Sequence, residues 1–375
     1  MKPRIAVFGN QHLNLGHAIA ADLALSGYEV NVFDLPEFEE TVAPIKKEGG
    51  IHVTGDKANL VSKKNGFARF NLITTDPGEA LKDVDVLFVD VPADEFEKRV
   101  KPIATCIKDG AILHFNYYGY WPSLRLSSVF KEAGKSNIAI TECPSTLYYA
   151  RGKGGHLDFQ VMKKRVSLSV FPGKRSREVF HVMHGLYPNF DLAENILQTN
   201  FENQNMLWHP AIALLNVGHF DRAGKRGDST VHFYNTGITK HTGVLSEAQD
   251  REREGVCNAY GVPYTPMTDL IRQYVNGQGK SMEEVQLNAN FLKARPAYPV
   301  REWEKWTKWD MPMALVPFVQ LAELAGLSVP IHRGFVDIFG AILGENFFKN
   351  GLTLERLGLG GLSKEEVLAY ISEGG

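Results

Sequence analysis

Cysteine is scarce in this chain of 375 residues, which has three copies, at Cys106, Cys143 and Cys257. Their wide and odd spacing provides neither a disulfide framework nor a set of zinc ligands. We therefore expect a reducing cytoplasmic setting and no metal site.

An excess of either charge is also absent. Lys and Arg number 41 against 43 Asp and Glu, so the net charge is −2. No broad electrostatic field attracts a polyanion, which argues against nucleic acid or an anionic membrane as the partner. A small-molecule partner is the better expectation.

Long apolar runs are missing as well. The most apolar neighbourhood, Met311 to Ile331, is interrupted by Gln320, Glu323 and three prolines, which favours a buried helix over a membrane span. The start MKPRIAVFGN leads directly into a strand pattern, so we expect no secretory signal. We expect a soluble protein of two domains, because 375 residues exceed one ordinary core.

The first 34 residues predict a strand, a glycine turn, a helix and a second strand. Arg4 to Phe8 is β-rich and ends at Gly9, HAIAADLALSG follows Gly16 with helical spacing, and a second strand from Tyr28 to Phe33 is followed by Asp34. In dinucleotide-binding sheets, this order places a pyrophosphate at the helix N-terminus and an acid on the adenosine ribose hydroxyls. Asp34 occupies that acidic position.

The glycine turn itself is irregular, because it is longer than G-x-G-x-x-G and lacks the middle glycine. A flavodoxin-like or purely structural βαβ unit therefore remains the alternative. Asp34 would repel the extra phosphate of NADP and no arginine follows it closely, so we expect NAD to be preferred, with NADP as the second candidate. The expected phosphate contacts are Gly9, Asn10, Gln11, His12 and Gly16.

Further strand patterns continue the α/β order, and the ends of two of them carry candidate cofactor contacts. Val91 and Pro92 follow one strand and Asn116 follows another, on the edge where ligands bind in such sheets. Taken singly, Pro92 and Asn116 are equally typical of ordinary turns. The predicted strands are Phe70 to Thr74, Val86 to Val91, Ala111 to Phe115, Ile138 to Thr141, an extended run from Phe159 to Phe171 and a short one near Asn195 to Gln198.

From about residue 199 the pattern changes to long helices. We therefore predict an α/β fold with a Rossmann-type dinucleotide-binding domain over residues 1–198, followed by an all-α domain over residues 199–375. The polar stretch Gly218 to Asp228 is expected to be a mobile surface loop.

One stretch of the helical half, NQNMLWHPAIALLNVG from Asn203 to Gly218, places a histidine at the head of an apolar run. If Pro210 occupies the first helical turn, its missing N–H has no cost. If the helix begins earlier, Pro210 removes a backbone bond beside His209. His209 is then either a capping or core histidine or a catalytic acid and base.

Several pieces, in their order along the chain, resemble the opine dehydrogenase family, the octopine and nopaline dehydrogenase group. The similarity covers nearly the whole chain. The matching pieces are the start with GHAIAADLALSG, EGGIHVTG, the VPA turn, ECPSTLYYAR, NQNMLWHP, FYNTGIT, DRERE and WTKWDMPMALVPFVQLAELAGLSVP.

The resemblance implies an oxidoreductase that joins an amino acid or amine to a 2-keto acid and reduces the resulting imine with NAD(P)H. It implies that His209 exchanges protons and that Asp310 is the carboxylate paired with it. Such a pairing fixes the imidazole tautomer. The alternative for Asp310 is a helix N-cap before Met311.

The resemblance also implies substrate contacts. The family usually has an arginine five positions before the aspartate, whereas this chain has Lys305, which keeps the charge but loses the two-pronged donor geometry. Arg301 is the second candidate for gripping a carboxylate. Asn203 and Asn205 match cleft positions, with helix capping as the alternative.

Two rival functions remain open from the residues alone. One is a 2-hydroxyacid or ketone dehydrogenase on the same scaffold with no amine partner. The other is a nucleotide-binding protein without turnover. A homodimer is compatible with the sequence, which does not fix the oligomeric state.

Overall fold

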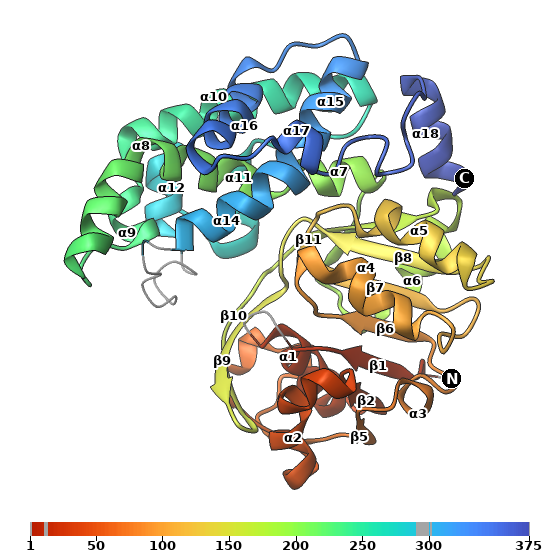
Figure 1. Cartoon of the computed structure of the whole chain (residues 1–375). Coiled ribbons are helices and arrows are strands. Elements are labelled where there is room, and N and C mark those ends of the chain that lie inside the picture. The colour runs from red at the N-terminus through yellow and green to blue at the C-terminus, as the bar shows by residue number, and fades with distance from the viewer. Residues whose placement is uncertain (1, 11–13, 290–299, 301, 375) are drawn as a thin grey trace. The chain divides into compact units, whose positions relative to one another are not determined.

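The structure, a computed structural model, describes residues 2–10, 14–289, 300 and 302–374. The chain forms two compact units, shown in Figure 1. The first comprises residues 1–117, 122–196 and 371–375, and the second comprises 118–121 and 197–370. Residues 118–121 therefore belong to the second unit, and residues 371–375 return to the first. The prediction had one boundary, after residue 198, and neither of these two exchanges.

The first unit is built on an eight-stranded sheet with the order β12-β11-β8-β7-β6-β1-β2-β5. β1 is parallel to β2 and β6, and the register pairs Phe8 with Phe33 and Val89. The central strands are buried throughout, as expected for a parallel sheet covered on both faces. The strands are β1 Ile5–Phe8, β2 Val30–Phe33, β5 Leu72–Thr74, β6 Val86–Val89, β7 Ile112–Tyr118, β8 Ala139–Cys143, β11 Val166–Phe171 and β12 Phe190–Leu192.

The order of these strands locates the ligand edge of the sheet. From β1 the chain adds β2 and β5 on one side and then returns to add β6 and β7 on the other. The direction of strand addition therefore reverses between β1 and β6, and ligands bind at such a switch point beyond the carboxyl ends of the strands. Gly9 follows β1 at this edge and Asp90 follows β6.

A second sheet of four strands, with the order β4-β3-β10-β9, completes the first unit. Helix α1 packs against β1 and β2 of the large sheet and against β3, β4 and β9 of the small one. The run from Phe159 to Phe171 divides between β10 and β11. The elements are α1 Leu15–Leu25, α2 Glu39–Glu48, β3 Gly50–Gly55, β4 Gly66–Arg69, α3 Pro77–Ala80, α4 Phe96–Val100, α5 Pro122–Glu132, β9 Tyr148–Lys153, β10 His156–Met162 and α6 Ser176–Leu186.

The second unit is helical. Its helices are α7 Ile196–Phe201, α8 Gln204–Arg226, α9 Phe233–Gly237, α10 Lys240–Tyr260, α11 Met267–Val275, α12 Met282–Asn288, α14 Glu302–Asp310, a π-helical turn Met311–Leu315, α15 Val316–Leu324, α16 Pro330–Leu343, α17 Phe347–Asn350 and α18 Lys364–Glu373, the last of which runs into residues of the first unit. Among the helices in the described part of the chain, none combines the length and apolar character needed to cross a membrane.

Two local predictions are wrong. The segment predicted as a strand near Asn195 to Gln198 belongs to α7, because a short apolar run does not distinguish a strand from a buried helix. The predicted loop from Gly218 to Asp228 continues α8 as far as Arg226. Phe220 and Ala223 are buried at helical spacing there, the last turn carries Lys225 and Arg226, and Gly227 ends the helix with φ 65°.

Candidate active site

The glycine turn brings β1 and α1 into very close contact. Gly9 has φ +82°, in the left-handed region that favours glycine, and a Cβ atom on Gly16 would lie 2.1 Å from the carbonyl oxygen of Gly9. The amide of Gly16 donates to Asp90 Oδ2 at 2.7 Å, and the amide of His17 donates to Asn10 Oδ1 at 3.0 Å. Gly9, Asn10 and Gly16 thus lie together at the start of α1.

This turn suits a dinucleotide, because Gly9 and Gly16 place no side chain where β1 meets the helix N-terminus. Contacts of Gly9, Asn10 and Gly16 with a pyrophosphate stay a prediction. Gln11 and His12, the other predicted phosphate contacts, lie outside the described residues.

Asp34, the predicted ribose ligand, follows β2 and is completely buried. Its Oδ1 accepts from the Leu35 amide at 2.8 Å and from the Arg99 guanidinium, and its Oδ2 accepts from the Thr41 hydroxyl at 2.8 Å. Burial raises the pKa of the Asp34 carboxyl above its ordinary value, and the positive charge of Arg99 opposes that rise.

Arg99 is a residue that the sequence reasoning missed. It lies on α4, 65 positions from Asp34, and its guanidinium stacks over Phe38 at 3.6 Å from the ring centroid. The expectation that no arginine accompanies Asp34 considered only neighbours in sequence. The structure brings an arginine to this carboxylate by tertiary packing, and no local motif signals it.

The other predicted cofactor residues lie at the carboxyl ends of β6 and β7. Val91 is buried, and Pro92 precedes a 3₁₀ turn that begins at Ala93. Asn116 is buried in β7, where its Oδ1 accepts from the Leu147 amide at 3.0 Å. Its Nδ2 is buried without a hydrogen-bond partner among the described residues, so this donor remains available for a ligand.

His209 and Asp310 form a buried hydrogen-bonded pair within the second unit. His209 lies on α8 and Asp310 ends α14, and the distance from Nδ1 to Oδ2 is 2.6 Å. The residues are 4% and 1% exposed. The other carboxylate oxygen, Oδ1, accepts from the Tyr120 hydroxyl at 2.6 Å, and the other ring nitrogen, Nε2, lies 2.7 Å from the Tyr234 hydroxyl.

The partners of His209 determine where its proton resides. A carboxylate only accepts hydrogen bonds, so Nδ1 carries the proton and donates to Asp310. Nε2 of the neutral imidazole is then an acceptor, and the Tyr234 hydroxyl donates to it. The pair therefore holds His209 in one tautomer with Nε2 ready to receive a proton.

Aromatic rings fix the plane of the imidazole. Trp306 stacks on His209 with 4.8 Å between ring centroids and 16° between planes, and Phe233 meets it edge-on at 5.6 Å. Trp306 and Asp310 are four residues apart on α14 and therefore lie on one helix face. One turn of α14 thus supplies both the stacking ring and the carboxylate.

Pro210 lies inside α8, so the helix begins before it and the arrangement with Pro210 in the first turn is not found. Proline has no N–H for the carbonyl of Met206. Gln249 of α10 donates to that carbonyl at 3.3 Å, and Ser246 of α10 donates to the carbonyl of Leu207 at 2.8 Å. Side chains of α10 thus replace the bond that proline removes beside His209.

The remaining predicted residues differ in their surroundings. Asn203 is the N-cap of α8, and its Oδ1 accepts from the Asn205 amide at 3.0 Å. Asp310 makes no capping bond to the turn that follows it. Lys305 is exposed, with its ammonium 5.0 Å from the centroid of the Trp309 ring. Arg301 lies outside the described residues.

Tyr120 and Tyr234 complete the hydrogen-bonded chain, yet the sequence indicated neither role. Tyr234 stands within FYNTGIT, which is quoted above only as one of the pieces that resemble the family. Tyr120 belongs to residues 118–121, which begin at the last residue of β7 but are part of the second unit. Trp121 next to it has φ 59°, a strained value for a bulky residue, and its amide donates to Asn200 Oδ1 at 3.0 Å.

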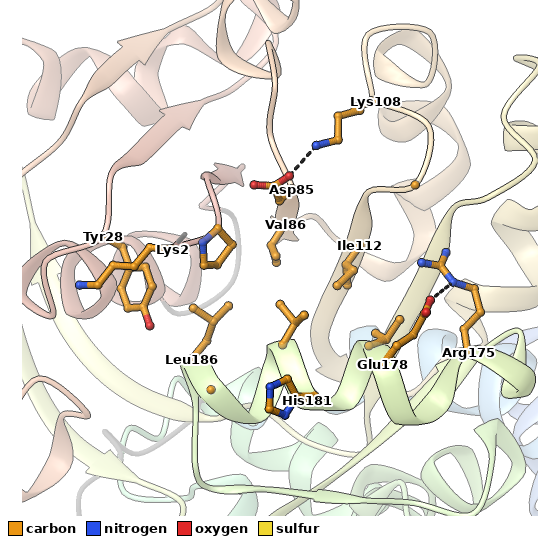
Figure 2. A pocket seen from close by; sticks show the side chains of 15 residues that line it. Lys2, Tyr28, Asp85, Val86, Lys108, Ile112, Arg175, Glu178, His181 and Leu186 are labelled. Carbon is orange, nitrogen blue, oxygen red and sulfur yellow. Dashed lines mark hydrogen bonds and ion pairs between the residues drawn. The ribbon is translucent and has the colours of Figure 1, made fainter.

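A cavity of about 730 Å³ in the first unit is a poor candidate for the reaction site (Figure 2). It lies at the amino ends of β1, β6 and β7, opposite the ligand edge of the sheet. Two ion pairs lie among the residues that line it, Lys108 with Asp85 and Arg175 with Glu178. His209 and Asp310 do not line it.

Comparisons with known proteins agree with this geometry. A family model described as NAD/NADP octopine/nopaline dehydrogenase, alpha-helical domain, matches residues 192–343. An opine dehydrogenase of Arthrobacter sp. (strain 1C) is 27% identical over 93% of this chain and 94% of that protein.

Solved structures share the fold. Octopine dehydrogenase in complex with NADH and agmatine has a TM-score of 0.74 at 19% identity, covering 98% of each chain. NADP⁺-bound yersinopine dehydrogenase has a TM-score of 0.66 at 13% identity, covering 99% of this chain and 98% of that one. The predicted fold class, a Rossmann-type domain followed by a helical one, is confirmed. Residues 192–343 thus match the helical domain of the octopine/nopaline dehydrogenase family, and nearly the whole chain is similar to an opine dehydrogenase.

Proposed function

We propose that the chain is an NAD(P)H-dependent opine dehydrogenase, which reduces the imine formed from an amino acid or amine and a 2-keto acid. The observation that carries the proposal is the buried pair of His209 and Asp310 in the family's helical domain, combined with a dinucleotide-binding sheet. The relative from Arthrobacter is an opine dehydrogenase, and the octopine dehydrogenase structure holds NADH and agmatine.

Two sets of residues perform the reaction in this proposal. Gly9, Asn10 and Gly16 hold the pyrophosphate at the start of α1, and Asp34 receives the ribose hydroxyls. Val91, Pro92 and Asn116 contact the other end of the dinucleotide. When bound, the dihydronicotinamide supplies the hydride that reduces the imine carbon.

His209 takes up and returns protons while Asp310 holds its tautomer and stabilises the imidazolium. Lys305 and Arg301 attract substrate carboxylates. Because Lys305 is a flexible point charge, it tolerates more than one carboxylate position, which suits a broader acid substrate than a two-pronged arginine does. Asn205, which is half-buried near the start of α8, donates or accepts a hydrogen bond to the substrate in this proposal. Asn203 caps the helix and accepts a bond from the Asn205 amide.

The decisive measurement is NADH oxidation with pyruvate, with and without a panel of amino acids and agmatine. We expect oxidation to require the amine, because the family chemistry reduces an imine. Equal rates without amine would support the 2-hydroxyacid or ketone dehydrogenase instead. Intact nucleotide binding with no turnover across the panel would support a nucleotide-binding protein.

We also propose that NADH is preferred and NADPH accepted. Asp34 disfavours the 2′-phosphate by charge, and Arg99 in contact with Asp34 reduces that penalty. Structures of this fold hold both cofactor types, NADH in one and NADP⁺ in another.

Asp34→Asn is expected to lower the ratio of the NADPH to the NADH dissociation constant about tenfold, corresponding to about 1.4 kcal/mol. The amide removes the negative charge that repels the phosphate and weakens the ribose contacts. Fluorescence titration of both nucleotides at pH 8 measures the ratio. Thr41→Val is the matched control, because it removes the hydrogen bond to Asp34 Oδ2 and keeps both charges. An equal change of the ratio in both variants would contradict the charge argument.

A further inference from the structure

The imidazole of His209 has no nitrogen left for a direct contact with substrate. Nδ1 is bonded to Asp310 and Nε2 to Tyr234, at 2.6 and 2.7 Å. Trp306 covers a face of the ring, Phe233 meets it edge-on, and the residue is 4% exposed. A proton that moves between substrate and Nε2 therefore has to pass the oxygen of Tyr234.

Tyr234 is held firmly in this position. It lies in the first turn of α9 and is 5% exposed. Its ring meets Trp208 at 6.4 Å and 80°, and Phe233 at 5.1 Å and 88°. Three aromatic neighbours, with Trp306 as the third at 5.7 Å, restrict the rotation that would move the hydroxyl away from Nε2.

We propose that Tyr234 is a catalytic residue whose hydroxyl contacts the reacting amine and relays protons between substrate and His209. This inference rests on the proposed opine dehydrogenase function. A phenolic oxygen donates one hydrogen bond and accepts others, so it receives a bond from a substrate ammonium while donating to Nε2. Such a chain is preorganised for a concerted shift of two protons.

The relay supplies and removes the protons that are needed when amine and keto acid condense to the imine. A proton of the substrate ammonium passes to the Tyr234 oxygen as the original phenolic proton passes to Nε2, which leaves a free amine and an imidazolium. The amine attacks the keto carbon, the carbonyl π pair moves to oxygen, and a second proton passes from nitrogen to oxygen within the adduct.

The stored proton then returns. Nε2 gives its proton to the Tyr234 oxygen as the phenolic proton passes to the hydroxyl of the adduct. The carbon–oxygen bond breaks, its electron pair leaves with water, and the nitrogen lone pair forms the carbon–nitrogen double bond. Asp310 stabilises the imidazolium in the interval, and Tyr120 holds the carboxylate that does so.

Tyr234→Phe tests the relay, because it removes the hydroxyl and keeps the ring. We expect kcat for amine-dependent NADH oxidation to fall about 10–100-fold with KM nearly unchanged. The solvent isotope effect on kcat should rise and the isotope effect of deuterated NADH should fall, because proton transfer becomes limiting. In the cofactor-free protein, the ¹⁵N resonance of His209 Nε2 should report the lost hydrogen bond.

Tyr260→Phe is the matched control. It removes another buried phenolic hydroxyl of the same unit, which donates to the carbonyl of Leu321 at 2.8 Å, and it should leave kcat unchanged. Wild-type or raised kcat in Tyr234→Phe would show that the hydroxyl does not relay protons. A fall of kcat with unchanged isotope effects would also contradict the relay. An inactive wild-type enzyme would instead contradict the proposed function itself.

Discussion

His209→Ala should lower kcat of amine-dependent NADH oxidation about 10²–10⁴-fold, with the dissociation constant of NADH little changed. In the proposed relay the imidazole is the terminal proton store, and alanine leaves Asp310 and Tyr234 without the group that joins them. The nucleotide contacts proposed above lie on other elements, so binding should persist. Steady-state kinetics and nucleotide titration of the same preparation give both quantities.

Asp310→Asn should reduce kcat by a similar order, and the double variant should lose little more than either single one, because the two residues act as a unit. His219→Ala is the matched control, since it removes another histidine from α8 outside the hydrogen-bonded chain. Near-wild-type activity of His209→Ala, or losses that simply multiply in the double variant, would exclude the assigned roles.

Acid should destabilise the first unit well before its carboxylates titrate. Burial lowers the pKa of His17 to about 4 and that of His114 to about 3, from an ordinary value of 6.5. Below pH 6.5 the unfolded chain binds protons that these folded side chains reject, so the free energy of unfolding falls with falling pH until the folded pKa values are reached.

Each of these histidines should therefore lower the free energy of unfolding by about 2 kcal/mol as the pH falls from 6.5 to 5. In the second unit, His332 should act in the same sense, because burial lowers its pKa although the bond to Glu252 opposes this. Asp34 acts in the opposite sense, because its pKa is raised. Urea unfolding at a series of pH values measures the slope.

His114→Phe isolates one histidine from the others. His114 lies edge-on to Phe88 at 5.2 Å and tilted against Phe190 at 5.3 Å, so a phenylalanine ring keeps these ring contacts and loses the contact of Nδ1 with Thr141 Oγ1. Between pH 5 and 6.5, the slope of the free energy of unfolding against pH should fall in the variant by an amount that corresponds to about one bound proton. His181→Gln, on an exposed position of α6, should keep the full slope. Parallel slopes in wild type and His114→Phe would show that the buried imidazole is not the source.

The elements that carry local signals could be predicted from the sequence. β1, Gly9, α1, β2 and Asp34 follow one another within 34 residues, and each is marked by periodicity, glycine or a strand-end acid. The helical character of the second half is equally local. The four-stranded sheet could not be derived in this way, because β3 pairs with β10, whose partner residues are about a hundred positions away.

The site shows the same division. The residues around His209 mark it as a candidate, but its pairing with Asp310 spans 101 positions and came only from family resemblance. Arg99 on Asp34 and Tyr120 on Asp310 span 65 and 190 positions, and no spacing rule joins them. Tyr234 carried no signal beyond its aromatic ring, because only the folded position of its hydroxyl distinguishes it from a core residue.

Because of Pro210, helix α10 supports the turn of α8 that carries His209, although no side chain of α10 takes part in the proposed chemistry. Since Pro210 interrupts the backbone hydrogen bonds directly after His209, the amide of Gln249 and the hydroxyl of Ser246 hold the carbonyls of the turn that carries this histidine. A change of the distance between α8 and α10 would therefore shift the helical turn that carries His209, although neither Gln249 nor Ser246 touches the imidazole hydrogen-bond chain.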